Sequence, residues 1–139
     1  MAEKKKILMI DDDNIIRDLF KFFFKTKKNF EFYTAVDMEE GWQKIIEYKP
    51  DCIILDLILP ENLSATAESQ EPNKEFGFKL LSKLKQAPET KDKPVLIFSN
   101  LSDPEDIERC KKFGADEYLA KTGVVPNQVL AKIQKLLGI

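Results

Sequence analysis

Five polar or charged residues follow directly on short strand-like runs, where their side chains are placed to do chemistry. In chain order they are Asp11, Asp12, Asp56, Ser99 and Lys121. The clearest example is the run Cys52–Leu55, four apolar residues that end at Asp56. Such a run predicts a strand covered on both faces, as in a parallel sheet, and the carboxyl ends of parallel strands meet at one edge. We therefore expect these five side chains to converge.

Three of the five residues are carboxylates, which repel one another when packed together unless a cation neutralises them. Oxygen ligands suit a hard divalent ion, and we predict Mg²⁺ (or Mn²⁺). An ammonium group and a hydroxyl aimed at the same point suit the oxygens of a phosphoryl group. Taken singly, each residue also suits an ordinary role as a helix cap, turn or solvated charge, so only their convergence indicates a site. The candidate working residue is Asp56.

The elements that must position these residues alternate between strand and helix. Strands are predicted at 4–10, 30–35, 51–60, 93–98 and 117–120. Helices are predicted after an Asp13 or Asn14 cap, from 37 to about 48, after Gly77, from 104 and from 126. Helical spacing places inward Ile16, Leu19, Phe20 and Phe23 in the first helix, and Met38, Trp42, Ile45 and Ile46 in the second. This order predicts a doubly wound five-stranded parallel sheet with helices on both faces.

The length of 139 residues fits one domain, 1–139, with an ordinary hydrophobic core. One segment breaks the alternation. Residues 61–75 are polar and have no hydrophobic period, so we expect a long loop at the mouth of the site. This loop is either a mobile, solvated segment or an element that shields the site or recognises a partner.

Composition argues against several classes of protein. The 22 basic and 24 acidic residues leave a net charge of −2, which provides no basic surface for nucleic acid. No apolar stretch approaches the roughly 20 residues that cross a bilayer, so we expect a cytoplasmic protein with no membrane partner. Cys52 and Cys110 lie in apolar contexts and are interpreted as reduced core residues. The chain has no histidine, which removes the commonest general base and any phosphohistidine of its own.

The motifs around the site resemble those of response regulator receiver domains. They are Ile7-Leu-Met-Ile-Asp11-Asp12-Asp13, Ile53-Ile-Leu-Asp56-Leu-Ile-Leu-Pro60, Leu96-Ile-Phe-Ser99 and Phe113-Gly-Ala-Asp-Glu-Tyr118-Leu-Ala-Lys121. The resemblance covers essentially the whole chain outside 61–75, which looks like an insertion. It implies a flavodoxin-like sheet and a role in a two-component phosphorelay.

The resemblance also implies a metal site and a phosphoacceptor. Asp56 would accept the phosphoryl group and belong to the metal site, in which Asp12 would bind the ion directly and Asp11 would reach it through water. The backbone carbonyl of Ile58 would complete the protein ligands. Transfer would be in line, catalysed by charge neutralisation and positioning rather than by a base.

Three further residues would respond to phosphorylation if the resemblance holds. Ser99 would hydrogen-bond the phosphoryl group, and Lys121 would pair with it. Tyr118 would be the switch aromatic that turns inward when Ser99 moves.

The chain departs from the family pattern beside Lys121 and beside Ser99. Thr122 stands where the family usually has a proline after a cis peptide bond. A non-proline cis bond costs roughly 2.5–4 kcal/mol, so we predict a trans bond, which leaves the direction of Lys121 open. Asn100 stands where the family usually has alanine or glycine, and its larger side chain is expected to hinder Tyr118 or to narrow access to the acceptor.

Two apolar residues flank the expected line of attack of water on a phosphorylated Asp56. They are Ile58 and Leu101, each two residues beyond a site residue. Because neither can orient a water molecule, we expect slow hydrolysis of the acyl phosphate. The protein would thus catalyse its own phosphorylation and slow dephosphorylation rather than turn over an external substrate.

We expect a stand-alone receiver, because no output domain follows Ile139. With no histidine in the chain, the donor would be a histidine kinase, a histidine phosphotransfer protein or a small acyl phosphate. A downstream protein would contact the face formed by the helix from 104, the strand from 117 and the last helix. No nucleic acid is expected as a partner.

Two other functions remain open from the sequence. Thr122 and Asn100 also suit a degenerate receiver that binds proteins without being phosphorylated. A hydrolase of the haloacid-dehalogenase type also begins with an aspartate nucleophile at a strand end, but its phosphatases need a second aspartate where this chain has Ile58.

Overall fold

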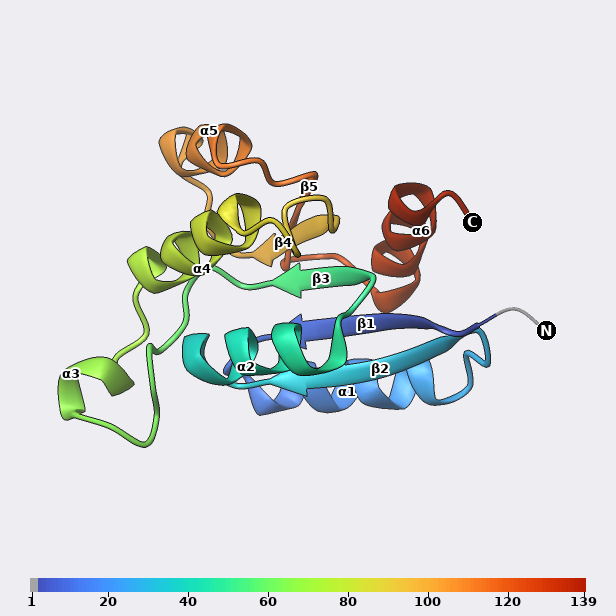
Figure 1. Ribbon diagram of the computed structural model, residues 1–139, viewed down its shortest axis with the longest axis horizontal. Helices are drawn as coiled ribbons and strands as arrows, with labels where there is room; N and C mark the ends of the chain where they lie inside the picture. Colours follow the sequence, from blue (N-terminus) through green and yellow to red (C-terminus); the bar gives the residue numbers. More distant parts are fainter. Residues whose placement is uncertain (1–2) are drawn as a thin grey trace.

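A computed structural model describes residues 3–139 and shows one parallel sheet between two layers of helices (Figure 1). The strands are β1 (Lys5–Ile10), β2 (Phe30–Ala35), β3 (Cys52–Leu55), β4 (Val95–Ser99) and β5 (Glu117–Ala120). All neighbouring strands pair in parallel, in the order β2-β1-β3-β4-β5. The predicted fold class is confirmed. β3 lies at the centre of the sheet, so its carboxyl end is surrounded by the other strands.

Six helices lie between or after these strands within the described residues. They are α1 (Asn14–Lys25), α2 (Met38–Tyr48), α3 (Ala67–Gln70), α4 (Lys74–Gln86), α5 (Pro104–Lys112) and α6 (Pro126–Leu137). None of them is long and apolar enough to cross a membrane. Side-chain caps begin α1, α2, α4 and α5, where turn chemistry predicts them. Asp13 accepts hydrogen bonds from the N–H groups of Ile15 and Ile16, and Asp103 precedes Pro104 as the cap of α5.

The sheet separates two hydrophobic cores. Alternate residues of β1 point to opposite faces, as the pleat of a strand requires. Ile7 and Met9 pack with α1 and α6 through residues such as Phe20 and Ile133. Leu8 and the other inward residues of the opposite face pack with α2, α4 and α5. The inner strands β1, β3 and β4 are therefore buried on both sides, which is why they contain continuous apolar runs in the sequence.

Two of the residues predicted to face inward lie outward. Leu19 and Ile46 are 47% and 42% exposed. In α1 the buried residues are Phe20 and Phe24, one helical turn apart. Leu19 instead continues an exposed apolar stripe with Ile15 and Phe22, which α1 leaves facing away from the sheet. Apolar residues surround most of this helix, so helical spacing alone did not define the buried side.

The segment after β3 also differs from the predictions. The strand ends at Leu55 rather than at 60, and residues 60 and 61 lie against the N-terminus of α2. There the carbonyls of Pro60 and Glu61 accept the free N–H groups of Met38 and Glu39. The expected loop 61–75 contains α3, and α4 begins at Lys74, before the expected Gly77.

The segment 61–73 forms an arm that projects beyond the body of the domain (Figure 1). Its hydrogen bonds are largely internal: the N–H groups of Glu61 and Asn62 both donate to the carbonyl of Ser69, whose side chain is buried. The buried carboxylate of Asp37 also accepts from the N–H of Leu63, 3.0 Å away. Two contacts therefore give this polar segment structure without an apolar core: a local turn and a cap shared with α2.

Two ion pairs join α4 to α5. Lys74 lies 3.1 Å from Asp106, which is 6% exposed, and Arg109 forms two 2.7 Å hydrogen bonds with Glu75. The Arg109 guanidinium also stacks on the ring of Phe78, 3.9 Å from its centroid. The start of α4, next to the arm, is thereby tied to α5.

Gly77 lies where α4 passes closest to the chain after β3. A Cβ atom at this position would lie 2.1 Å from the carbonyl oxygen of Leu57 and 2.3 Å from its Cα. We expect Gly77→Ala to lower the free energy of unfolding by about 3 kcal/mol, since the clash is with backbone that cannot rotate away. Urea denaturation measures this. Ser82→Ala, on the same helix, is the control, and equal stabilities of the two variants would contradict the close approach.

Candidate functional site

The five predicted site residues meet at the carboxyl edge of the sheet. Backbone hydrogen bonds that continue the ladders place them: Asp56 N–H donates to the carbonyl of Ile10 at 3.0 Å, and Lys121 N–H to that of Ser99 at 3.2 Å. The chain leaves the sheet just after these bonds, which frees the side chains to point across the edge. Asp11 is held in the same way, by the carbonyl of Ala35. The predicted convergence is therefore observed.

Asp56 occupies the centre of the site and is 6% exposed. Its two oxygens have different partners. Oδ1 accepts hydrogen bonds from the hydroxyl of Ser99 at 2.7 Å and from the N–H of Ile58 at 3.0 Å. Oδ2 accepts from the ammonium group of Lys121 at 2.7 Å. Strands β4 and β5 thus each supply one donor to a carboxylate delivered by β3.

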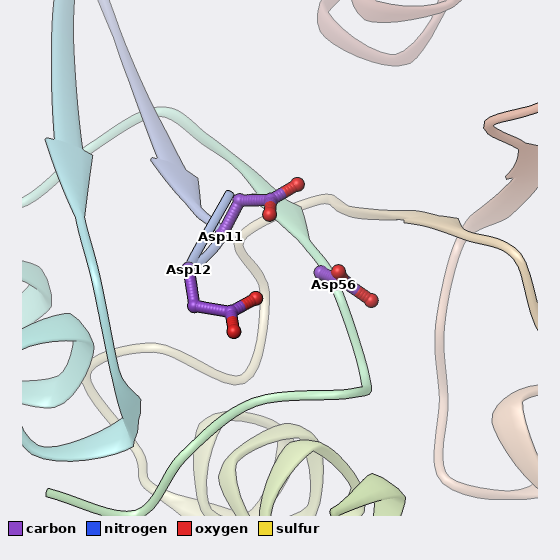
Figure 2. A group of neighbouring side chains, drawn as sticks. All are labelled: Asp11, Asp12 and Asp56. Atoms are coloured by element: carbon purple, nitrogen blue, oxygen red, sulfur yellow. The ribbon is translucent and has the colours of Figure 1, made fainter. Parts of the chain in front are cut away.

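Asp11, Asp12 and Asp56 form an acidic cluster in which one oxygen from each lies within 4.8 Å of the others. Figure 2 shows the three carboxylates gathered beyond the ends of β1 and β3. Asp11 is 1% exposed. Its Oδ2 forms a 2.7 Å ion pair with Nζ of Lys121 and has no other polar partner among the described residues. This buried oxygen has capacity for a further cation.

Crowding of charge shifts the pKa values of these groups. Burial and the neighbouring Asp56 raise the pKa of Asp11 to about 6, although Lys121 opposes the shift. The same two causes raise the pKa of Asp12. Burial alone would lower the pKa of Lys121, but the charges of Asp56 and Asp11 raise it above its usual value. Lys121 therefore stays charged and partly neutralises the three acids.

An open cavity of about 420 Å³ leads to Asp56. It is lined by Asp12, Asp13, Asp56, Ile58, Pro72, Asn100 and Lys121. Pro72 comes from the arm, so the segment expected at the mouth of the site does reach it. Ile58 is half-buried here, and its carbonyl as a metal ligand stays a prediction.

Tyr118 is half-buried against the core of α2, α4 and α5. Its hydroxyl donates to the carbonyl of Leu101 and lies 3.4 Å from that of Ser99. Burial raises the pKa of this hydroxyl, which keeps it a donor. Asn100 lines the cavity beside Asp56, and its effect on Tyr118 stays a prediction. The role of Tyr118 as a switch also stays a prediction.

Sequence reasoning treated Asn100 and Thr122 as unrelated departures, whereas they are hydrogen-bonded to each other. The peptide bond between Lys121 and Thr122 is trans, as predicted, and the Lys121 side chain still reaches Asp56. The pairing of strand ends in a parallel sheet could have suggested the contact, because Asn100 and Thr122 each lie one residue beyond a site residue.

Protonation of Asp11 provides a test of the crowded acids. Its folded-state pKa of about 6 exceeds the ordinary 3.8, so the stability it contributes below pH 3.8 is lost as the pH rises through 6. Without divalent cations, Asp11→Asn should raise the free energy of unfolding at pH 7.5 by roughly 2–3 kcal/mol and lose this advantage toward pH 3. Urea denaturation at both pH values measures it. Asp18→Asn, an exposed acid on α1, is the control; a destabilised Asp11→Asn protein at pH 7.5 would contradict this electrostatic balance.

Comparison with known proteins matches the same region of the chain. The family model for the response regulator receiver domain matches residues 7–134. The DNA-binding dual master transcriptional regulator RpaA of Synechocystis is 33% identical over 132 residues, which are 95% of this chain and 48% of RpaA. The oxygen regulatory protein NreC of Staphylococcus epidermidis is 30% identical over 91% of this chain and 52% of NreC. The chain thus spans about half the length of these curated relatives.

Solved structures show the same fold. The CheY-like receiver domain protein of Methanospirillum hungatei superposes with a TM-score of 0.80 at 25% identity, over 98% of this chain and 95% of that one. The chemotaxis response regulator CheY4 of Vibrio cholerae has a TM-score of 0.77 at 25% identity, over 96% and 99% of the two chains. The predicted site residues meet at the carboxyl edge of the sheet, and the family model matches most of the chain. The chain therefore belongs to the response regulator receiver domain family of two-component systems.

Proposed function

We propose that this receiver accepts a phosphoryl group onto Asp56 in a Mg²⁺-dependent reaction. It then signals through a conformational switch at the ends of β4 and β5, where Ser99 and Tyr118 lie. One observation carries the proposal. The hydroxyl of Ser99 and the ammonium of Lys121 contact opposite oxygens of a single buried carboxylate, at 2.7 Å each, beside two further acids. A hydroxyl and an ammonium group held at the two oxygens of one carboxylate are also placed to bind the oxygens of a phosphoryl group attached there.

In the proposed reaction an oxygen of Asp56 attacks the phosphorus of the donor in line with the bond that breaks. A P–O bond forms to the carboxylate, and the donor group leaves with the electron pair of its bond to phosphorus. Lys121 and Ser99 already lie at the carboxylate, so they are placed to bind the incoming phosphoryl oxygens without large movement. No residue acts as a base, since the nucleophile is already ionised.

The acidic cluster fits a divalent cation. The donors are carboxylate oxygens, the preferred ligands of Mg²⁺, and the buried Asp11 Oδ2 faces only the ammonium group of Lys121. We propose that Asp12 and Asp56 bind the ion directly, with the Ile58 carbonyl, while Asp11 reaches it through water. Such an ion, or Mn²⁺ in its place, supplies charge neutralisation for phosphoryl transfer.

The donor proposed is a phosphohistidine on a histidine kinase or a histidine phosphotransfer protein, because this chain has no histidine. The exposed stripe of Ile15, Leu19 and Phe22 lies on α1, which follows directly on the acidic residues 11–13. This stripe offers such a partner an apolar surface. We further propose a downstream protein target on the face of α5, β5 and α6. The two free, buried cysteines fit the reducing cytoplasm as its location.

The receiver itself is proposed to act through protein partners rather than through nucleic acid. Curated relatives about twice its length carry names of transcriptional regulators, and the DNA binding in the name of RpaA is a property of that longer protein. Residues 61–75 are proposed as an insertion that helps partners to recognise the site, since Pro72 lines the cavity.

Labelling with acetyl phosphate tests the proposed function. We expect Mg²⁺-dependent incorporation of one phosphoryl group per chain, none in Asp56→Asn, and none in wild type when the divalent ion is chelated. Intact-mass spectrometry measures it, with Asp51→Asn at the other end of β3 as the control that still labels. Absence of labelling in wild type, by acetyl phosphate and by a phosphohistidine donor alike, would favour a phosphorylation-independent binding module.

The lifetime of the acyl phosphate tests the apolar surroundings of Asp56. Ile58 lines the cavity and Leu101 packs against the core, so neither can hold a water molecule for attack. We expect labelled wild type to decay over hours, and Ile58→Asn to decay about tenfold faster because an amide can orient water. Leu63→Asn, on the arm, should match wild type. Decay of the wild type within minutes, without a phosphatase, would contradict the expectation.

A further inference from the structure

Asn100 and Thr122 link the two loops that flank the site. Oδ1 of Asn100 accepts the backbone N–H of Thr122 and its hydroxyl, both at 3.1 Å. The orientation of the amide follows from the contact, because only the oxygen of an asparagine side chain can accept the Thr122 N–H. A proline at position 122 would have no N–H to donate, and an alanine at position 100 would have no acceptor. Each residue therefore gives the other its partner.

The contact lies next to Lys121 in the chain. The N–H of Lys121 donates to the carbonyl of Ser99 at 3.2 Å, and its carbonyl accepts from the N–H of Val124 at 3.3 Å. Asn100 then holds the next N–H along the chain, that of Thr122. The side chain of Asn100 thus continues the hydrogen bonding between the ends of β4 and β5 by one residue, to Thr122. The backbone that carries Lys121 is held on both sides.

A long, flexible side chain depends on such an anchor. Lys121 must extend its four-carbon stem to place Nζ 2.7 Å from both Asp56 and Asp11. A shift in the direction of its Cα–Cβ bond displaces the ammonium group. We propose that Asn100 is a positioning residue that acts through Thr122 to hold Lys121 on Asp56. Its part in catalysis rests on the proposed phosphoryl transfer, whereas its part in holding Lys121 does not.

Positioning can be separated from structural support. Asn100 and Thr122 are both exposed, so their hydrogen bond contributes little to folding and its loss should leave the urea midpoint unchanged. In Asn100→Ala the Thr122 amide should exchange faster with solvent. The NMR signal of the Lys121 ammonium, observable while the group is salt-bridged, should broaden or vanish. Neither readout requires phosphorylation.

The labelling rate then measures the consequence. At saturating acetyl phosphate and Mg²⁺, Asn100→Ala should label about tenfold more slowly, because misplacement of a catalytic group lowers the rate of transfer. Thr122→Val loses the hydroxyl alone and should slow labelling about twofold to threefold. The double variant should match Asn100→Ala, since the contact is already lost. Thr122→Ser keeps both donors and should restore the wild-type rate, and Ser102→Ala is the matched control on the same loop.

The outcomes distinguish the two proposals. If wild type is not labelled, the proposed function fails, and the Lys121 ammonium signal alone decides the positioning role. If wild type is labelled but Asn100→Ala retains its rate and its ammonium signal, the positioning role fails. Independent, multiplying effects of Asn100→Ala and Thr122→Val would also overturn it.

Discussion

The ammonium group of Lys121, 2.7 Å from both Asp56 and Asp11, is the interaction on which the site depends. Three acids at the edge of the sheet repel one another, and burial strengthens this repulsion because it removes the screening of water. One lysine supplies the neighbouring positive charge, which offsets only part of this penalty. The pKa of Asp11 therefore stays raised despite Lys121. The site is therefore under electrostatic stress, which suits the proposed binding of a divalent ion and a phosphoryl group.

The fold keeps these like charges close together because it holds the backbone around the site rigidly. β3 is central and buried on both faces, so Asp56 cannot withdraw into solvent without disturbing the ladders on either side. The close approach of Gly77 to Leu57 holds the chain just beyond Asp56 against α4. On the other side, Asn100 and Thr122 join the loops that carry Ser99 and Lys121. Rigid elements thus present the reactive groups, as precise positioning requires.

Much of this arrangement could be predicted from the sequence, and the reason is periodicity. Runs such as Cys52–Leu55 are apolar at every position because both faces of a parallel strand are buried, and such runs end where a polar residue must face the edge. Asp56 and Ser99 were identified in this way, and Lys121 by its position after the short strand at 117–120. The method failed where more than one side of a helix is apolar, as at Leu19, because spacing does not specify which side meets the sheet. It also failed for the arm, where the Ser69 turn and the shared Asp37 cap replace apolar packing.

The sequence by itself determined the fold class, the order of the elements and the residues that reach the carboxyl edge, since local patterns of burial and turn chemistry encode these. Only the tertiary structure decided how they meet. Hydrogen bonds and ion pairs such as Lys121 with Asp11, or Asn100 with Thr122, join residues far apart in the chain whose side chains carry no periodic signal. Their existence depends on the register and direction of strand ends, which arise only when the whole sheet has assembled.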